Sequence, residues 1–352
     1  MSGSTLSQYN CQNFVRYSRH IICNLACLGR HTISKLICTS GGDQKDWSAE
    51  YKLYSKERID SSTIFTSILK KVSGSEPVNT PLVVAMDDTL LRKSGKKIPK
   101  TRYLRDPLGP PFQTNFVRGQ RFIQISAALK RTENQSRMIP VSFECAPVVP
   151  KPKKNAPQSE WEKYKNETKT KNLSAYGCDM LNSLKKNLTK NNEKRALWAT
   201  VDGSYTNKNV IRNISKGITI IGRIRADAKL YYLPEEFSVK GRKKVYGLRA
   251  PTPEQLRQDQ NIPYVTAKAF AAGKMHDFKI KTINNLLWRT AGKNVQLRLI
   301  VIAPLGYRLT KNGKMLYRDP AYIICNDTNS SIEEILQAYL WRWDIEVNFR
   351  DE

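Results

Sequence analysis

The hydrophobic positions divide the chain into an N-terminal helical stretch and a later stretch of short strands. Between residues 11 and 72, apolar residues recur every three or four positions, which is the spacing of one face of a helix. Gly29 interrupts this spacing, and Thr32 can then cap a second helix over Ile33–Thr39. The apolar positions that carry the pattern are Phe14, Ile21, Ile22, Leu25, Leu28, Ile33, Leu36 and Ile37.

A helix, a glycine turn and a short second helix are also the parts of a helix-turn-helix element that binds DNA. The second helix would open with Thr32, Ser34 and Lys35, which suit contacts with phosphates. Two ordinary packed helices would give the same pattern, so both interpretations stay open. We interpret residues 1–76 as an N-terminal helical DNA-binding region.

Short apolar runs bounded by turn residues follow the proline-rich segment 77–81 and predict strands. Residues 82–86 form a continuous apolar run, which is typical of a central strand buried on both faces. Further strands are predicted for 121–129, 138–145, 196–201, 218–224, 264–270, 279–288, 295–303 and 321–325, helices for about 161–188, 207–215 and 331–352, a loop for 88–118 and a hairpin turn at Asn312–Gly313.

The charge balance points to a polyanionic partner. Lys and Arg number 59 against 31 acidic residues, a formal net charge of +28. Phosphate backbones are the usual partner of such a chain, whereas an anionic membrane is disfavoured because no apolar run could span one. Seven cysteines, an odd number, fit free thiols in a reducing compartment, and no secretory signal is visible. We therefore expect a cytoplasmic, nucleoid-associated protein that binds double-stranded DNA.

Two predicted strands run directly into an aspartate. Residues 82–86 lead into Asp87 and Asp88, and residues 196–201 lead into Asp202. Because ligands gather at the carboxyl ends of strands in an open sheet, neighbouring strands that end in Asp would aim both carboxylates into one crevice. Each Asp could instead open a turn or cap the next helix.

The predicted C-terminal helix adds a third carboxylate. Tyr339, Arg342 and Glu346 are spaced by three and four residues, so they share one helical face. Arg342 and Glu346 could be an ordinary solvated ion pair. The neighbouring large apolar side chains favour a functional site: Trp341, Trp343, Ile345, Val347 and Phe349.

Three carboxylates on a strongly basic chain suggest phosphodiester cleavage. They can hold two divalent ions, roughly 3.5–4 Å apart, that activate an attacking oxygen and stabilise the leaving one. Ligation by oxygen alone selects hard ions, so two Mg²⁺ or Mn²⁺ ions are the expected cofactor.

These residues resemble the DDE transposases of bacterial insertion sequences, in the cut-and-paste branch. Tyr339, Arg342 and Glu346 match the branch's Tyr-x2-Arg-x3-Glu-x6-Lys motif, whose Lys would fall just after Glu352, so the chain resembles a member truncated at the C-terminus. The run Met86-Asp87-Asp88-Thr89 resembles the context of the family's first Asp and favours Asp87 over Asp88. The Asp-x-x-Tyr context of the second Asp fits Asp202 and Tyr205.

The resemblance implies an α/β fold: a ribonuclease-H-like, mixed five-stranded sheet flanked by helices, with an N-terminal helical region and a β-rich insertion. It divides the chain into residues 1–76, a core at 77–227, a basic insertion at 228–320, and the last strand and catalytic helix at 321–352. Trp288 is a candidate for stacking on a flipped base, although a core role is favoured.

The roles that the resemblance implies are specific. Asp87, Asp202 and Glu346 would be the catalytic metal ligands, and Tyr339 and Arg342 would bind DNA phosphate. The protein would cleave and transfer strands at transposon ends, as a homodimer that pairs two ends. The alternative is a catalytically inactive DNA-binding remnant or regulator. A zinc site at His20, Cys23, Cys27 and His31 is disfavoured, because one helix cannot wrap four ligands around an ion.

Overall fold

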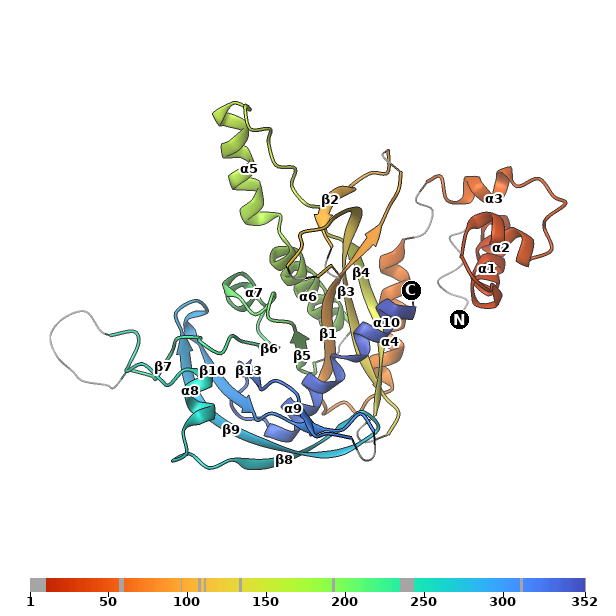
Figure 1. The fold of residues 1–352 in the computed structure, drawn as a ribbon. Coiled ribbons are helices and arrows are strands. Elements are labelled where there is room, and N and C mark those ends of the chain that lie inside the picture. The colour runs from red at the N-terminus through yellow and green to blue at the C-terminus, as the bar shows by residue number, and fades with distance from the viewer. Residues whose placement is uncertain are drawn as a thin grey trace. The chain divides into compact units, whose positions relative to one another are not determined.

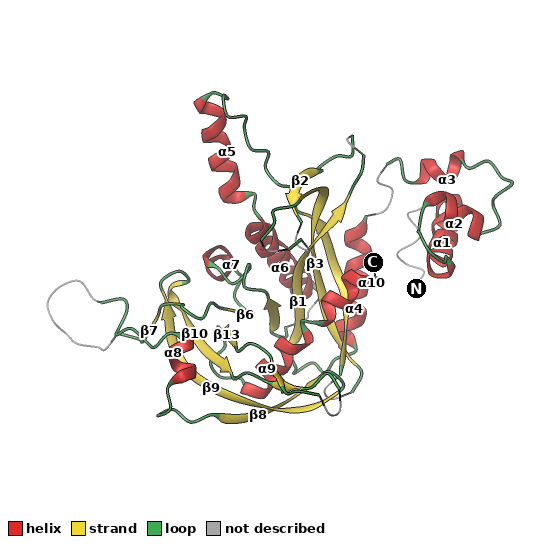
Figure 2. Cartoon of the chain, viewed as in Figure 1, coloured by secondary structure: helices red, strands yellow, loops and turns green. Residues whose placement is uncertain are grey.

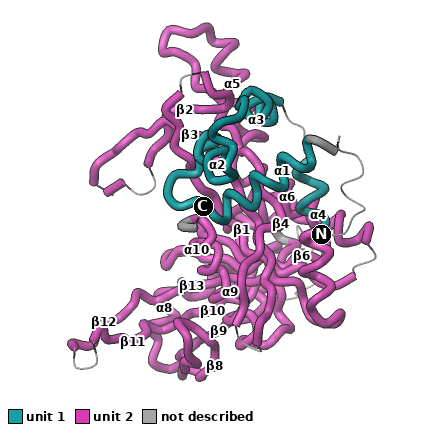
Figure 3. The backbone as a smooth tube through the Cα atoms, turned by 90° about the vertical axis from the view of Figure 1, so that its right-hand side faces the viewer, with its two compact units in different colours: residues 1–67 teal, residues 68–352 magenta. Residues whose placement is uncertain are grey.

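The computed structural model describes residues 11–56, 60–95, 97–106, 109–110, 112–132, 135–191, 194–234, 244–310 and 313–351. The chain forms two compact units, residues 1–67 and 68–352, which Figure 3 shows in different colours.

Unit 1 is helical, as the apolar spacing predicts. Its helices are α1 (Cys11–Ala26), α2 (Ile33–Thr39) and α3 (Ser48–Leu53), while α4 (Ser61–Gly74) runs across the boundary into unit 2. Gly29 has a φ of +91°, a conformation that favours glycine, and it separates α1 from α2. The Thr32 side chain accepts a hydrogen bond from the Lys35 N–H, so the predicted cap and the bounds of α2 are confirmed.

A buried glutamate organises the α1–α3 contact. Glu50 lies beside Arg19 and is 2.8 Å from Nε2 of the buried His20. The other ring nitrogen of His20 lies 2.7 Å from the Tyr54 hydroxyl. The histidine that begins the zinc-like spacing therefore contacts Glu50 and Tyr54.

Unit 2 is built around one mixed 11-stranded sheet, drawn in yellow in Figure 2. Its strand order is β2-β3-β1-β5-β6-β13-β10-β9-β7, with β4 paired to β3 and β8 paired to β9. The strands are β1 (Leu82–Arg92), β2 (Arg102–Arg105), β3 (Phe116–Lys130), β4 (Ser136–Cys145), β5 (Leu197–Val201), β6 (Ile218–Arg223), β7 (Leu230–Tyr231), β8 (Val265–Ala271), β9 (Lys274–Trp288), β10 (Gly292–Ile302) and β13 (Ala321–Cys325). The helices of unit 2 are α5 (Gln158–Thr170), α6 (Leu173–Lys190), α7 (Lys208–Asn213), α8 (Pro253–Gln258), α9 (Ile332–Trp341) and α10 (Asp344–Asp351).

The mixed α/β fold class is confirmed, because β4, β3 and β1 pair antiparallel and β1, β5 and β6 pair parallel. The sheet then continues beyond these strands. β13 pairs antiparallel with β6, and β10 pairs antiparallel with β13. The strands of residues 228–320 therefore extend the same sheet through β13.

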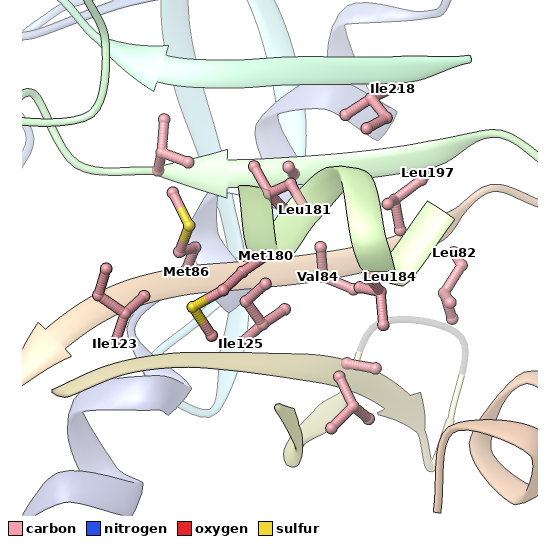
Figure 4. Packing of buried hydrophobic residues seen from close by; sticks show 14 of the residues in the cluster. Leu82, Val84, Met86, Ile123, Ile125, Met180, Leu181, Leu184, Leu197 and Ile218 are labelled. Atoms are coloured by element: carbon pink, nitrogen blue, oxygen red, sulfur yellow. The ribbon is translucent and has the colours of Figure 1, made fainter. Parts of the chain in front are cut away.

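Two hydrophobic clusters cover the two faces of the sheet around β1. Leu82, Val84 and Met86 pack with residues of α6, as Figure 4 shows. Val83 and Ala85 belong to the cluster that contains α9 residues. This alternation follows from the strand period of two, and it fixes the face toward which each residue after Met86 points.

Several predicted element boundaries are wrong. β1 continues past Met86 to Arg92, and β2 lies within the predicted loop at 88–118. The register explains this result, because Asp87 to Arg92 stay paired with β3 down to Gly119. The helix predicted over 161–188 is two helices, since Asn172 caps the start of α6.

The predicted C-terminal helix is also two helices, α9 and α10. Between them, the amides of Arg342, Trp343, Ile345 and Glu346 each bond the carbonyl three residues earlier, so this turn is tightened.

A short pair of strands, β11 (Gly306–Tyr307) and β12 (Leu316–Tyr317), flanks the predicted hairpin turn, of which Asn312 lies outside the described residues. Within the described part of the chain, the helices all fall short of the length and apolarity needed to cross a membrane.

Gly222 provides a test of how tightly the sheet packs around β5 and β6. A Cβ at this position would overlap Thr206 Oγ1 and lie 2.8 Å from Val201 Cγ2. We expect Gly222→Ala to lower the free energy of unfolding by about 1–3 kcal/mol in urea denaturation, because the added methyl group forces neighbouring core atoms into strained positions. Gly74→Ala is the control, since its Cβ meets nothing within 4 Å. Equal effects of the two substitutions would contradict this packing.

Candidate active site

The middle of β1 presents two carboxylates to opposite faces of the sheet. Asp87 follows Val83 and Ala85 in the alternation and therefore faces the α9–α10 side. Asp88 faces the α6 side, where its Oδ1 accepts a hydrogen bond of 2.9 Å from the Tyr205 hydroxyl. The two neighbouring aspartates thus have different surroundings and cannot serve the same site.

Asp202 lies beside Asp87 because their strands are parallel neighbours. Met86 of β1 is in register with Val201 of β5, so the next residue of each strand is an aspartate at the same edge. The negative charge of Asp202 is one of the factors that raise the pKa of Asp87. After Asp202 the chain turns, with the amides of Tyr205 and Thr206 both bonded to the Asp202 carbonyl. The structure brings the two predicted aspartates together.

The third predicted carboxylate reaches the site through α9 and α10. Ser331 and Glu334 form a capping box that starts α9, and Tyr339 lies buried near its end. Arg342 occupies the tightened turn, and Glu346 lies in the first turn of α10. Tyr339, Arg342 and Glu346 therefore stay near one another although the helix is not continuous.

Polar contacts with β4 fix the start of α10. The Ser136 hydroxyl donates a hydrogen bond of 3.3 Å to Asp344, and Asn348 donates one of 3.1 Å to the Met138 carbonyl. Ile345 between them is fully buried in the α9-side cluster. The side chain of Glu346, by contrast, is 44% exposed. The helix is therefore held by one face, while Glu346 projects from the other.

Arg342 joins two of the three carboxylates. One terminal nitrogen of its guanidinium lies 3.2 Å from Asp87 Oδ2 and the other lies 3.3 Å from Glu346 Oε1. The Arg342 side chain is only 8% exposed. Because a buried cation needs anionic partners, the two carboxylates and Arg342 depend on one another.

Burial raises the pKa of Asp87 to about 6, and the neighbouring charges of Asp88 and Asp202 act in the same direction. The amide of Asp88 and the guanidinium of Arg342 oppose this shift only in part. Burial also raises the pKa of Tyr339, whose hydroxyl lies in the field of Arg342, Arg223 and Asp202. The main cause of the shift at Asp87 is thus its burial, which the contact with Arg342 offsets only in part.

On the opposite face, Asp88 links the two strand ends. It accepts a hydrogen bond from Tyr205 and lies 3.4 Å from Nε of Arg121. Tyr205 is 1% exposed and belongs to the same turn as Asp202. The Asp88–Tyr205 bond therefore fixes the turn that carries Asp202 to the strand that carries Asp87.

The donor set suits a hard divalent cation in kind, since it offers carboxylate oxygens and an aspartate whose charge Arg342 compensates only in part. In the present conformation the Arg342 guanidinium lies between Asp87 and Glu346. Among the described residues, His, Cys, Asp and Glu side chains do not gather in threes or more at distances that would hold a metal.

The sequence analysis did not identify the residues that contact Asp88 on the α6 side of β1. Arg121 was predicted only as the first residue of a strand, and Tyr205 only as part of a family context. The strand alternation from Val83 to Asp88 was the available signal for the separation of the two aspartates. Trp288, the candidate for base stacking, packs partly buried against the cluster around β9 and β10.

The chain matches a known protein family. A model of the family described as DDE superfamily endonuclease matches residues 23–289, which is most of the chain and includes Asp87 and Asp202. No curated protein matches significantly.

The raised pKa of Asp87 predicts the sign of a pH effect on stability. The folded protein binds a proton at Asp87 more tightly than the unfolded chain does, so this residue favours folding below about pH 4 and loses that effect as pH rises through about 6. Asp87→Asn removes this titration. In EDTA, we therefore expect the change in the free energy of unfolding caused by the substitution to be more favourable at pH 7.5 than at pH 4, by on the order of 2 kcal/mol. Urea denaturation of both proteins at the two pH values measures this difference. A gain independent of pH would exclude titration of Asp87 as the cause.

The Asp88–Tyr205 bond predicts a cost for Tyr205→Phe. The substitution leaves a partly buried carboxylate with one partner fewer, so we expect a loss of about 1–2 kcal/mol in urea denaturation. Tyr176→Phe on α6 is the matched control, because the structure gives its hydroxyl no hydrogen-bond partner among the described residues. If both variants were as stable as the wild type, the Asp88–Tyr205 hydrogen bond would contribute nothing to the free energy of unfolding.

Proposed function

Since the chain belongs to the DDE superfamily of endonucleases, we propose that it is a DNA transposase that cleaves strands at transposon ends and transfers them. The observation that carries the proposal is the meeting of Asp87, Arg342 and Glu346, residues separated by up to 259 positions in the chain, beside Asp202. The net charge of +28 supports double-stranded DNA as the substrate.

In this proposal Asp87, Asp202 and Glu346 hold two Mg²⁺ or Mn²⁺ ions. When bound, the ions would supply activation of the attacking oxygen and stabilisation of the leaving oxygen. Asp87 would act with both of the other ligands, because its strand is in register with the strand that precedes Asp202 and Arg342 joins it to Glu346. Its raised pKa indicates that a nearby positive charge would favour its ionised form.

Arg342 and Tyr339 would bind the phosphate beside the scissile bond. The planar guanidinium presents two donors toward the crevice, and these now contact Asp87 and Glu346. If a DNA phosphate replaced one of these carboxylates as a partner of Arg342, the arginine would stay paired. The released carboxylate would then be available to bind a cation. Tyr339, buried next to Arg342, would orient the same phosphate through its hydroxyl.

Cleavage would proceed by attack of water on the phosphodiester, with release of a 3′-hydroxyl. That hydroxyl would then attack a phosphodiester of the target DNA, which completes strand transfer without an external energy source. Pairing of two element ends would require two copies of the chain, so we propose a homodimer in the working complex. The helical residues of unit 1, with Lys35 exposed on α2, are the proposed site of end recognition.

Separate alanine substitutions of Asp87, Asp202 and Glu346 test the proposal. We expect each to reduce Mg²⁺-dependent nicking of DNA that carries the sequences flanking the coding region by on the order of 100-fold or more, while DNA binding persists. Glu333→Ala is the control, because Glu333 is exposed in the first turn of α9 and lies outside the site. Gel assays of supercoiled plasmid with Mg²⁺, Mn²⁺ or EDTA measure nicking.

Retained nicking in one of the three variants would remove that residue from the site. A wild-type chain that binds DNA but nicks it with neither metal would instead identify the alternative function, a DNA-binding remnant or regulator.

A further inference from the structure

A cavity of about 400 Å³ opens on the α6 face of unit 2, away from Asp87. Its walls come from α5, the start of α6, the segment after β4 and the turn after β5. The volume is within the range of roughly 300–1,000 Å³ that is usual for small-ligand sites. The cavity lies outside the carboxylate site described above and has no role in it.

The cavity adjoins the carboxylate site through β1 and one turn. Ser204 and Tyr205 line the cavity, and Asp202 begins the same turn. Arg121, another lining residue, contacts Asp88, which is the neighbour of Asp87. The cavity and the carboxylate site are therefore connected by the turn after β5 and by the contact of Arg121 with Asp88.

The lining has the chemistry of a nucleotide site. Arg121 and Lys171 are its cationic side chains, and Lys171 also lies 3.5 Å from Glu167, which is outside the lining. Arg121 approaches Asp88 through Nε, which leaves its two terminal nitrogens without a partner in the described parts of the chain. Tyr164 and Tyr176 add aromatic rings on which a base can stack.

The wall formed by α5 extends the positive surface. This helix has no buried residue, and it projects from the rest of unit 2 in Figures 1 and 3. Residues 147–171, which include α5, contain seven lysines and three glutamates. A helix that contributes little to the core but carries such an excess of lysine suits contact with phosphates.

We propose that the cavity holds one nucleotide of the DNA strand next to the cleavage site. Its phosphate would contact Arg121 and Lys171, and its base would lie against Tyr164 and Tyr176. The nucleotide must leave the duplex stack to enter, so the site would select DNA that is single-stranded or opened beside the break. This proposal rests on the function proposed above and adds a specific subsite to it.

Tyr164→Ala and Lys171→Ala test the subsite in the full chain. The probe is a fluorescein-labelled duplex with a single-stranded 3′ overhang, titrated in EDTA at several salt concentrations by fluorescence anisotropy. We expect Tyr164→Ala to weaken binding at least roughly fivefold, because a stacked base is lost, and Tyr164→Phe to restore it. We expect Lys171→Ala to lower the slope of log K against log salt by about 0.7–0.9, as for one phosphate contact.

Two controls separate the subsite from general attraction to a basic surface. Lys186→Ala removes an exposed charge from α6 outside the cavity, and a blunt duplex of the same sequence removes the overhang. We expect the Tyr164→Ala effect to vanish on the blunt duplex. An overhang that contains 5-iododeoxyuridine should crosslink under ultraviolet light to Tyr164 or Tyr176, as mapped by mass spectrometry.

The proposal is overturned if Tyr164→Ala binds the overhang as the wild type does, if the loss is equal on the blunt duplex, or if the crosslinks fall elsewhere. These outcomes in a protein that still nicks DNA would leave the proposed function intact. Failure of the wild-type chain to bind either DNA would overturn both.

Discussion

The site depends on a partly buried carboxylate of a central strand, Asp87, and the arginine next to it. Asp87 extends a strand whose preceding residues, from Leu82 to Met86, are all buried, so it enters the α9–α10 side with little water around it. Desolvation favours the neutral acid, and the guanidinium of Arg342 only partly offsets it. The arginine is itself buried and needs Asp87 and Glu346 as partners. Each group is therefore tolerated because of the others, and the arrangement stays responsive to any cation or phosphate that offers a better partner.

Local patterns predicted the parts of this site but not their assembly. The buried strand that leads into Asp87, the strand that ends just before Asp202 and the cap at Thr32 follow from short-range rules, and the structure contains all three. The extension of β1 to Arg92 did not follow, because the polar run Asp87-Asp88-Thr89 interrupts the apolar pattern and is held in the strand by pairing with β3. That pairing is a long-range contact, which composition over a short window does not encode.

The break between α9 and α10 has a similar origin. The segment from Tyr339 to Glu346 contains neither proline nor glycine, so periodicity alone predicts one continuous helix. The tightened turn coincides with the buried Arg342 and with Ile345, which is fixed in the core, while Asp344 and Asn348 bond to β4. Tertiary contacts on both sides of the turn thus set the direction of Glu346. Tyr339, Arg342 and Glu346 remain on one side because the turn between α9 and α10 is still helical.

The alternation of β1 has a further consequence for how the two faces act together. Asp87 and Asp88 are consecutive, so any shift of this strand end moves both at once. Asp88 is held by Tyr205, which follows Asp202 in one turn, and by Arg121, which lines the neighbouring cavity. A ligand that drew Arg121 toward itself would weaken one of the two contacts of Asp88 and leave Tyr205 to hold the strand end. Tyr205 and Arg121 therefore belong both to the contacts of Asp88 and to the lining of the cavity on the opposite face.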